Sequence, residues 1–173
     1  MAPRSAGASI ETVLKTPGQL LAFKPLTRVL ATKAPGIRAV APKTSILDAL
    51  RLMADKEIGF LVVLDGAALV GVVSERDYAR KVILQGKASI DTPVAEIMTR
   101  DVVSVGLAHT IPECMALMNQ HGIRHLPVID SGAVIGVLSV RDLLKEIVEH
   151  HERLIRNLEL ERSTLLNQRG SHY

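Results

Sequence analysis

The sequence is poor in cysteine and in aromatic residues. Its 173 residues include one cysteine, Cys114, no tryptophan, two tyrosines and two phenylalanines. A single cysteine excludes a disulfide framework and a cysteine-rich zinc site, and we interpret Cys114 as a small core residue rather than a nucleophile. With only 2% aromatic residues, the chain offers no platform on which single-stranded nucleic acid could stack. The core must therefore be aliphatic.

Long hydrophobic runs are also missing. The longest, at residues 60–64, is far shorter than the roughly 18 apolar residues that a membrane-spanning helix needs. Together with the single cysteine, this predicts a soluble, cytoplasmic protein in a reducing compartment, with no membrane partner. An apolar content of 47% and a mean hydropathy of +0.23 exclude a disordered chain.

Positive charge is concentrated near the N-terminus. Residues 1–40 hold six cations and one acid, which gives +5, whereas the 15 cations and 17 acids of the remainder give −2. The body therefore offers no basic face for a nucleic acid. We interpret residues 1–25 as a basic N-terminal arm. The alternative is an organellar transit segment, which would place the protein in an organellar matrix.

An internal repeat with a period of 65 residues organises the chain. Residues 40–78 align without a gap on residues 105–143, with 14 of 39 positions identical, whereas unrelated pairs of this composition would match at about one position in fifteen to twenty. The body is therefore two copies of one unit. We place the copies at residues 26–87 and 88–150, followed by a C-terminal helix and tail at residues 151–173.

The sequence pattern of each copy predicts the order strand, helix, strand, strand, helix. Ser45 and Thr110 stand three residues before an acid, which is the spacing of a helix-capping box, and a second helix is expected after Ser74 and after Ser139. One unit cannot cover both faces of its own sheet, so the fold class is α/β (α+β), with two β-α-β-β-α repeats packed about a pseudo-twofold axis. The predicted strands are 37–40, 60–64 and 69–73 in copy one, and 102–105, 126–129 and 134–138 in copy two.

The segments outside the repeat also predict helices. Short helices are expected at residues 26–32 and 94–98, ahead of the two copies, and the last helix should run to about residue 165. Leu154, Leu158 and Leu165 form a narrow apolar stripe on this extension. Such a stripe is typical of a helix that meets a partner helix, and it predicts a homodimer.

A duplicated motif, Gly-x-x-Ser-x-x-Asp, ends the third strand of each copy and opens the following helix. One interpretation is purely structural: the Ser and the Asp cap the helix, and the Gly allows close packing. The other is functional, because free backbone N–H groups at a helix start favour a phosphate, and a carboxylate can accept both hydroxyls of a ribose cis-diol. The motifs are Gly71–Asp77 and Gly136–Asp142.

A second element distinguishes the two copies. Copy two begins its second strand with Ile123, Arg124, His125 and a Leu-Pro-Val run, where copy one has the uncharged Gly59 and Phe60. Arg and His side by side are either a solvated turn or a phosphate clamp, in which Arg offers fork donors and His a tunable donor.

These features resemble the CBS-domain family, whose domains occur in tandem pairs called Bateman modules. The resemblance covers about residues 26–150 and is closest to proteins made of one CBS pair. It implies two clefts between the repeats, a ligand such as AMP, ADP, ATP or NAD, and a ribose held by the motif's Asp and Ser. The residues implied for one cleft are Ile37, Arg38, Ile58, Arg124, His125, Ser139, Arg141 and Asp142. Those implied for the other are Ser74, Arg76, Asp77, Val102, Val103 and Ile123.

The resemblance implies a regulatory module rather than an enzyme. No paired-carboxylate site, phosphate-binding loop or nucleophile motif is present, and neighbouring His150 and His151 cannot share a metal ion from one helix face. We expect an adenine-nucleotide sensor, with AMP as the first candidate ligand, that acts through a homodimer or an unidentified regulated protein. We also expect the Asp142 cleft to bind more tightly, because Arg124 and His125 are assigned to it. The alternative is an interaction module with one or both clefts vacant.

Overall fold

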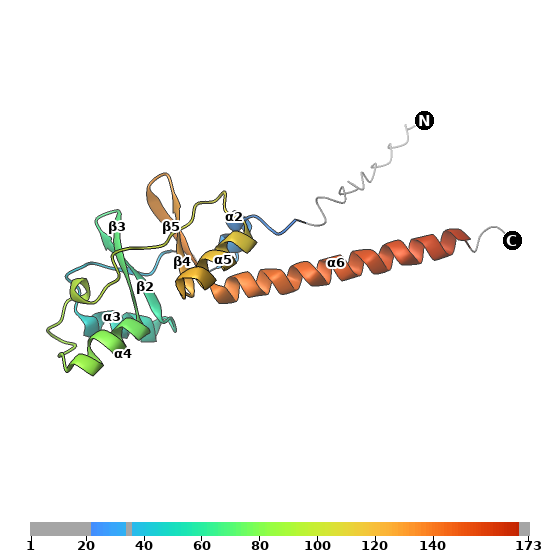
Figure 1. Cartoon of the computed structure of the whole chain (residues 1–173). Coiled ribbons are helices and arrows are strands. Elements are labelled where there is room, and N and C mark those ends of the chain that lie inside the picture. Colours follow the sequence, from blue (N-terminus) through green and yellow to red (C-terminus); the bar gives the residue numbers. More distant parts are fainter. Residues whose placement is uncertain (1–21, 34–35, 170–173) are drawn as a thin grey trace, which may run out of the picture. The chain divides into compact units, whose positions relative to one another are not determined.

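The computed structural model describes residues 22–33 and 36–169. Residues 24–147 form the folded body, and residues 148–169 form a second unit together with residues 22–23. Most of the predicted arm, residues 1–21, lies outside the described residues, as does the end of the predicted tail. The body is mixed α and β with two small sheets, which confirms the predicted fold class (Figure 1).

The first repeat contains a three-stranded sheet. The short strand β1 pairs in parallel with β2, and β2 pairs in antiparallel fashion with β3. Ser45 caps the first helix by accepting a hydrogen bond from the backbone N–H of Asp48 at 3.1 Å, as predicted. The elements are β1 (Ala39–Val40), α3 (Ile46–Asp55), β2 (Phe60–Asp65), β3 (Ala68–Ser74), α4 (Glu75–Lys81) and the 3-10 turn η1 (Ile83–Gln85).

The second repeat reproduces this plan with one difference. The hairpin β4–β5 has the pairing register of β2–β3 shifted by 65 residues, including an irregularity after Val63 and after Val128. The predicted strand 102–105 is reduced to a single parallel bridge between Val105 and Val128, so this sheet has two strands. The elements are α5 (Ile111–His121), β4 (His125–Asp130), β5 (Ala133–Ser139) and α6 (Val140–Arg169).

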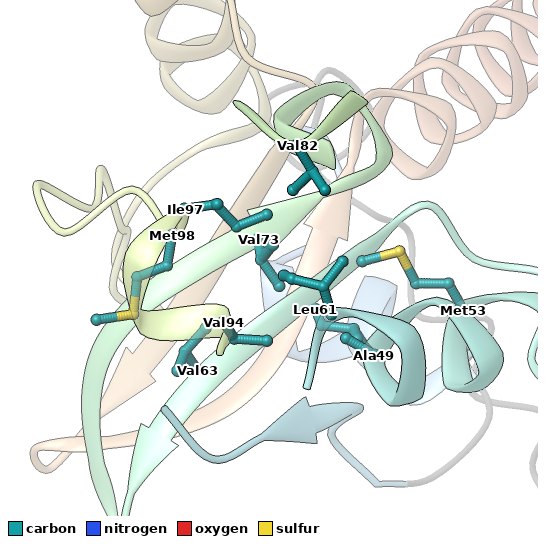
Figure 2. Close-up of a cluster of buried hydrophobic side chains, with 10 residues drawn as sticks. Ala49, Met53, Leu61, Val63, Val73, Val82, Val94, Ile97 and Met98 are labelled. Atoms are coloured by element: carbon teal, nitrogen blue, oxygen red, sulfur yellow. The ribbon is translucent and has the colours of Figure 1, made fainter. Parts of the chain in front are cut away.

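The core is aliphatic, as the composition requires. Leu61, Val62 and Val63 of β2 are fully buried, and so are Leu126 and Val128 of β4. Figure 2 shows the first of these cores, where side chains from α3, β2 and β3 meet those of the segment that leads into the second repeat. The buried residues labelled there are Ala49, Met53, Leu61, Val63, Val73, Val82, Val94, Ile97 and Met98.

The segment ahead of each repeat packs on the other repeat. The 3-10 turn η2 (Val94–Glu96) leads to Thr99, which exchanges two backbone hydrogen bonds with Val72 of β3 at 2.8 and 2.9 Å. Helix α2 (Leu26–Ala31) instead packs on β5 of the second repeat. A Cβ added to Gly136 would lie 2.8 Å from Leu30, and one added to Gly71 would lie 2.7 Å from the sulfur of Met98. The motif glycines therefore permit this crossed packing.

Candidate functional site

A cleft of about 770 Å³ opens between the two repeats within the body. Its walls come from the start of β2, the end of β3 and both ends of α4 on one side, and from residues 99–103 and 122–127 on the other. This volume is ordinary for a small-molecule site. The cleft brings together all the residues predicted for the Asp77 side, namely Ser74, Arg76, Asp77, Val102, Val103 and Ile123.

Ser74 and Asp77 form a helix-capping box at the start of α4. The Asp77 Oδ2 atom accepts hydrogen bonds from the Ser74 backbone N–H at 3.1 Å and from its hydroxyl at 2.7 Å. The other oxygen, Oδ1, pairs with the ammonium of Lys81 at 2.7 Å. The structural interpretation of the motif is thus realised in full. It leaves the functional interpretation open, because the same carboxylate lines the cleft.

The lining of the Asp77 cleft has a small excess of positive charge. Arg76, Arg80, Lys81 and Arg124 line it together with His125, against three acids, Glu75, Asp77 and Asp101. Arg76 donates to the carbonyl of Gly122 at 3.4 Å, across the gap between the repeats. Arg80 and Arg124 are exposed and have no ion-pair partner within the part of the chain that the structure describes. A cleft with low-dielectric walls and unpaired cations favours an anionic ligand.

The structure places Arg124 and His125 in the wall of the Asp77 cleft, whereas the resemblance assigned them to the Asp142 cleft. The reason is the meeting of the two repeats at their second strands. The rings of Phe60, which begins β2, and His125, which begins β4, stack with centroids 4.6 Å apart and planes 15° apart. The first residue of each strand therefore reaches toward the opposite repeat, and Phe60 lines the same cleft.

The pKa of His125 is also affected by charged groups on the Asp142 side. Burial lowers the pKa of this imidazole, the charges of Lys33 and Arg124 lower it further, and only Asp142 opposes them. The neutral ring is therefore favoured near neutral pH. His125 lies between the two sides, with a neutral ring that can donate one hydrogen bond and accept another.

Asp142 caps α6 as Asp77 caps α4, but its cation comes from elsewhere. Its Oδ2 atom accepts from the backbone N–H and the hydroxyl of Ser139, each at 2.7 Å, and from the ammonium of Lys33 at 2.6 Å. Lys33 also donates to the carbonyl of Val137 at 2.7 Å. Burial raises the pKa of Asp142, but the hydrogen bonds from Lys33 and Ser139 outweigh it and hold the pKa below its usual value.

The remaining residues predicted for the Asp142 side are dispersed. The Arg38 carbonyl accepts from the backbone N–H of Val62, Ile58 packs against the first core, and Arg141 is exposed. Within residues 22–33 and 36–169, no hydrogen bond or ion pair joins Ile37, Arg38, Ile58 or Arg141 to Asp142. Their contact with a ligand stays a prediction.

Sequence reasoning missed Lys33, because it precedes the ungapped repeat. One signal was present. Four residues after Asp77 the first repeat has Lys81, but four residues after Asp142 the second repeat has Glu146. The helical cation is therefore absent from the second copy, and any cation that pairs with Asp142 comes from another segment.

Other candidate groups fall outside the clefts. Cys114 is fully buried on α5, and burial raises the pKa of its thiol, so it packs as a core residue. No group of three or more potential metal-ligating side chains occurs in the described parts of the chain. In those same parts, no helix combines the length and the apolar character needed to cross a bilayer.

The sequence pattern of the CBS domain matches this chain twice, at residues 33–83 and 94–149. With the duplicated fold and the crossed packing, this defines the class of protein: the chain belongs to the CBS-domain family and carries a tandem pair. It is 38% identical over 118 residues to the mitochondrial CBS domain-containing protein CBSX3 of Arabidopsis thaliana. That match covers 65% of this chain and 57% of the relative, so the chain spans little more than half of CBSX3.

Solved structures give the same family. A CBS-domain protein from Burkholderia ambifaria is 44% identical, with a TM-score of 0.70, over 73% of this chain and 95% of that one. A CBS-domain protein from Pyrobaculum aerophilum, solved in complex with AMP, is 27% identical, with a TM-score of 0.62, over 69% and 89% of the two chains. Another CBS pair, 26% identical with a TM-score of 0.63 over 71% and 94%, was solved with 5′-methylthioadenosine and S-adenosyl-L-methionine.

Proposed function

We propose that this chain is a regulatory module that binds an adenine nucleotide and has no catalytic activity of its own. The observation that carries the proposal is the 770 Å³ cleft, which is lined by Ser74 and Asp77 of one repeat and by Arg124 and His125 of the other and has a small excess of positive charge. A ribose diol would replace Lys81 at Asp77, and the phosphate would lie among the cations. AMP is the first candidate, with ADP, ATP and NAD as alternatives.

The relatives with bound ligands support an adenosine-type ligand. One was solved with AMP and another with 5′-methylthioadenosine and S-adenosyl-L-methionine, so this fold accepts both anionic and uncharged or cationic adenosine derivatives. The charge of the Asp77 cleft favours the anionic kind here.

The proposed test is calorimetric titration of the full chain with AMP, ATP, NAD and S-adenosyl-L-methionine, alongside a thermal-shift series. A ligand that binds only the native state raises the melting temperature as its concentration rises above Kd. We expect saturable AMP binding without conversion of the AMP. No heat and no shift with any of these ligands at millimolar concentration would refute the proposal, as would turnover of the nucleotide.

A second candidate function is an interaction module with vacant clefts. It is favoured by one specific observation: both motif carboxylates already have a lysine partner and complete capping bonds, Asp77 with Lys81 and Asp142 with Lys33. Mass spectrometry of small molecules that co-purify with the protein separates the candidates, because a sensor should retain an adenine nucleotide and an interaction module should not.

We also propose that the module acts as a homodimer that meets a still unidentified regulated protein. Large apolar side chains are exposed after α4, at Ile83 and Leu84, and along α6, at Leu144, Val148, Ile155, Leu158, Leu160 and Leu166. The first four of those on α6 recur at steps of four, seven and three residues, which is the spacing of a coiled-coil seam. Leu160 and Leu166 lie off this spacing. Leu154 is half-buried, and the side chain of Leu165 lies outside the described residues.

Light scattering on the full chain and on a version that ends at residue 150 tests this assembly. A twofold interface would bury the same apolar face on both chains. A dimer that weakens on truncation is expected. A monomeric full chain at tens of micromolar would refute the homodimer, and an undisturbed dimer after truncation would assign the interface to residues before 151.

A further inference from the structure

Lys33 is the cation of the second capping carboxylate. Its ammonium lies 2.6 Å from Asp142 Oδ2 and 2.7 Å from the carbonyl oxygen of Val137. Both partners belong to the second repeat, although Lys33 belongs to the first, where it lies between α2 and β1. The side chains of Lys33 and Asp142 are 33% and 22% exposed, so the pair is only partly screened by solvent and part of each side chain remains accessible.

The end of helix α2 holds Lys33 in this position. Its backbone N–H donates to the carbonyl of Leu30 at 3.0 Å, and the hydroxyl of Thr32 donates to the carbonyl of Val29 at 2.8 Å. The helix itself is anchored by the buried Leu26 and Val29 and by the close approach of Leu30 to Gly136. The ammonium is therefore presented by a fixed backbone rather than by a free loop.

The hydrogen bonds of Asp142 decide what a ligand must displace. Oδ2 already accepts three donors, two from Ser139 and one from Lys33, whereas Oδ1 accepts none from the described residues. A ribose diol that uses both oxygens needs room on Oδ2. The Ser139 bonds belong to the cap of α6, so Lys33 is the donor that must leave.

From this geometry we propose that Lys33 makes the predicted Asp142 cleft selective for phosphorylated adenosine derivatives over uncharged ones. The inference rests on the proposed function and specifies the ligand class of one cleft. When an anionic nucleotide binds, Lys33 exchanges one anionic partner for another, because the phosphate replaces the carboxylate. An uncharged nucleoside such as 5′-methylthioadenosine displaces the ammonium from Asp142 and supplies no anion, which leaves a partly desolvated cation without an anionic partner.

The groups around Lys33 strengthen this selection. His125 is close enough for the charge of Lys33 to lower its pKa, and Arg124 acts on His125 in the same direction. A Lys33 displaced from Asp142 can keep its hydrogen bond to the Val137 carbonyl, but it has lost its anionic partner. An anion brought by the ligand replaces that partner.

The experiment compares AMP with uncharged 5′-methylthioadenosine by calorimetry on the full-length protein. An Asp77→Asn background weakens the other cleft while an amide oxygen can still cap α4, so the heat reports on the Asp142 cleft. In this background we expect Lys33→Met to raise the Kd of AMP at least about tenfold, the typical worth of a charge-assisted hydrogen bond. The Kd of 5′-methylthioadenosine should stay unchanged or fall, because its competitor for Asp142 is gone.

Two further variants serve as controls. Lys33→Arg retains the charge and should keep the preference for AMP. Lys43→Met removes an exposed lysine that has no ion-pair partner in the described part of the chain, and it should change neither affinity. Circular dichroism melts of each variant verify that α2 stays docked. If Lys33→Met unfolds α2, Lys33→Gln, which can still donate to Val137, replaces it.

The outcomes separate this inference from the proposed function. Equal weakening of both ligands by Lys33→Met would mean that Lys33 only supports the fold, and no change in either would also overturn the selection. If the wild type binds AMP but the Asp77→Asn protein binds neither ligand, the Asp142 cleft is not a ligand site and the inference fails while the function stands. If the wild type binds no adenine compound, both fail.

Discussion

The two repeats have the same backbone but obtain the cation of their capping carboxylate in different ways. Asp77 takes Lys81 from its own helix, four residues on, at 2.7 Å. Asp142 takes Lys33 at 2.6 Å, from a segment 109 residues earlier in the chain. The local pair joins two residues of the same helix, α4. The long-range pair joins a residue just after α2 to the second repeat, and so stabilises the docking of α2.

The position of Lys81 shows how the copies diverged. The second repeat has Glu146 there, and Glu146 is buried and pairs with Lys24 at 3.1 Å. Lys24 and Lys33 flank α2, so both ends of this helix are joined to α6 by ion pairs. Duplication therefore conserved the capping and the strand register, and the divergence lies in the long-range charges.

The largest expected effects are losses of stability on truncation of a core leucine, and they should be equal in the two repeats. Leu61 and Leu126 occupy the same position and are both fully buried. Leu61→Ala and Leu126→Ala should each lower the free energy of unfolding by about 2–5 kcal/mol, through lost burial and a residual cavity. Urea denaturation measures both. If either variant loses less than about 1 kcal/mol, the two cores are not equivalent.

Ligand binding should differ between the repeats. Arg80 and Arg124 line the Asp77 cleft without ion-pair partners in the described structure, so we expect Asp77→Ala to cost about 1.5–3 kcal/mol of AMP binding free energy and Asp142→Ala less. This prediction is the opposite of the preference expected from the sequence, because Arg124 and His125 also line the Asp77 cleft. Calorimetry on both single variants decides, and a larger loss in Asp142→Ala would restore the sequence-based expectation.

The motif glycines provide a smaller contrast. A Cβ at Gly71 would approach the Met98 sulfur at 2.7 Å and the Thr99 carbonyl oxygen at 3.1 Å, whereas one at Gly136 would meet only Leu30 side-chain atoms. A side-chain end can move, but the Thr99 carbonyl is held by its backbone bonds to Val72. Gly71→Ala should therefore destabilise the fold by about 1–3 kcal/mol, and Gly136→Ala by less, as thermal unfolding would show. Equal losses would contradict this reasoning.

The smallest expected effect is the pH dependence of the stability that Asp142 contributes. The pKa of Asp142 is lowered in the folded state, so its stabilisation is present above the unfolded pKa of about 3.9 and is lost as pH falls through the folded pKa. Asp142→Asn should thus cost under about 1 kcal/mol at neutral pH, as for a partly exposed pair, and progressively less below about pH 4. Unfolding titrations at several pH values measure this, and a difference that persists at the lowest pH would mean that the amide disrupts the cap itself.

The duplicated fold could be predicted from sequence because its signals are local. The capping residues Ser45 and Thr110, the alternating apolar runs and the 65-residue period determine helices and strands within each copy. The strand at 102–105 was predicted too long, because apolar residues there line a cleft instead of joining a ladder. Apolar character alone does not distinguish these two surroundings.

The site was less predictable, since it depends on how the copies meet. All residues proposed for the Asp77 side line one cleft. They could be proposed because the motif of copy one and the segments 102–103 and 123 of copy two can both be located from the 65-residue repeat. The location of His125 depends on its stacking with Phe60, and the role of Lys33 depends on the docking of α2. Neither contact leaves a periodic trace in the sequence, so both required the structure.

The pairing of Lys24 with Glu146 brings the two ends of the folded body together. The backbone N–H of Lys24 donates to Glu146 at 3.1 Å, so the first and last residues of the folded body, 24 and 147, lie close together. Adjacent ends are the condition for circular permutation. A permuted body that joins residue 147 to residue 24 through a short linker, and opens at the exposed turn around Gly86, should keep both cores and the Asp77 cleft while reversing the order of the repeats.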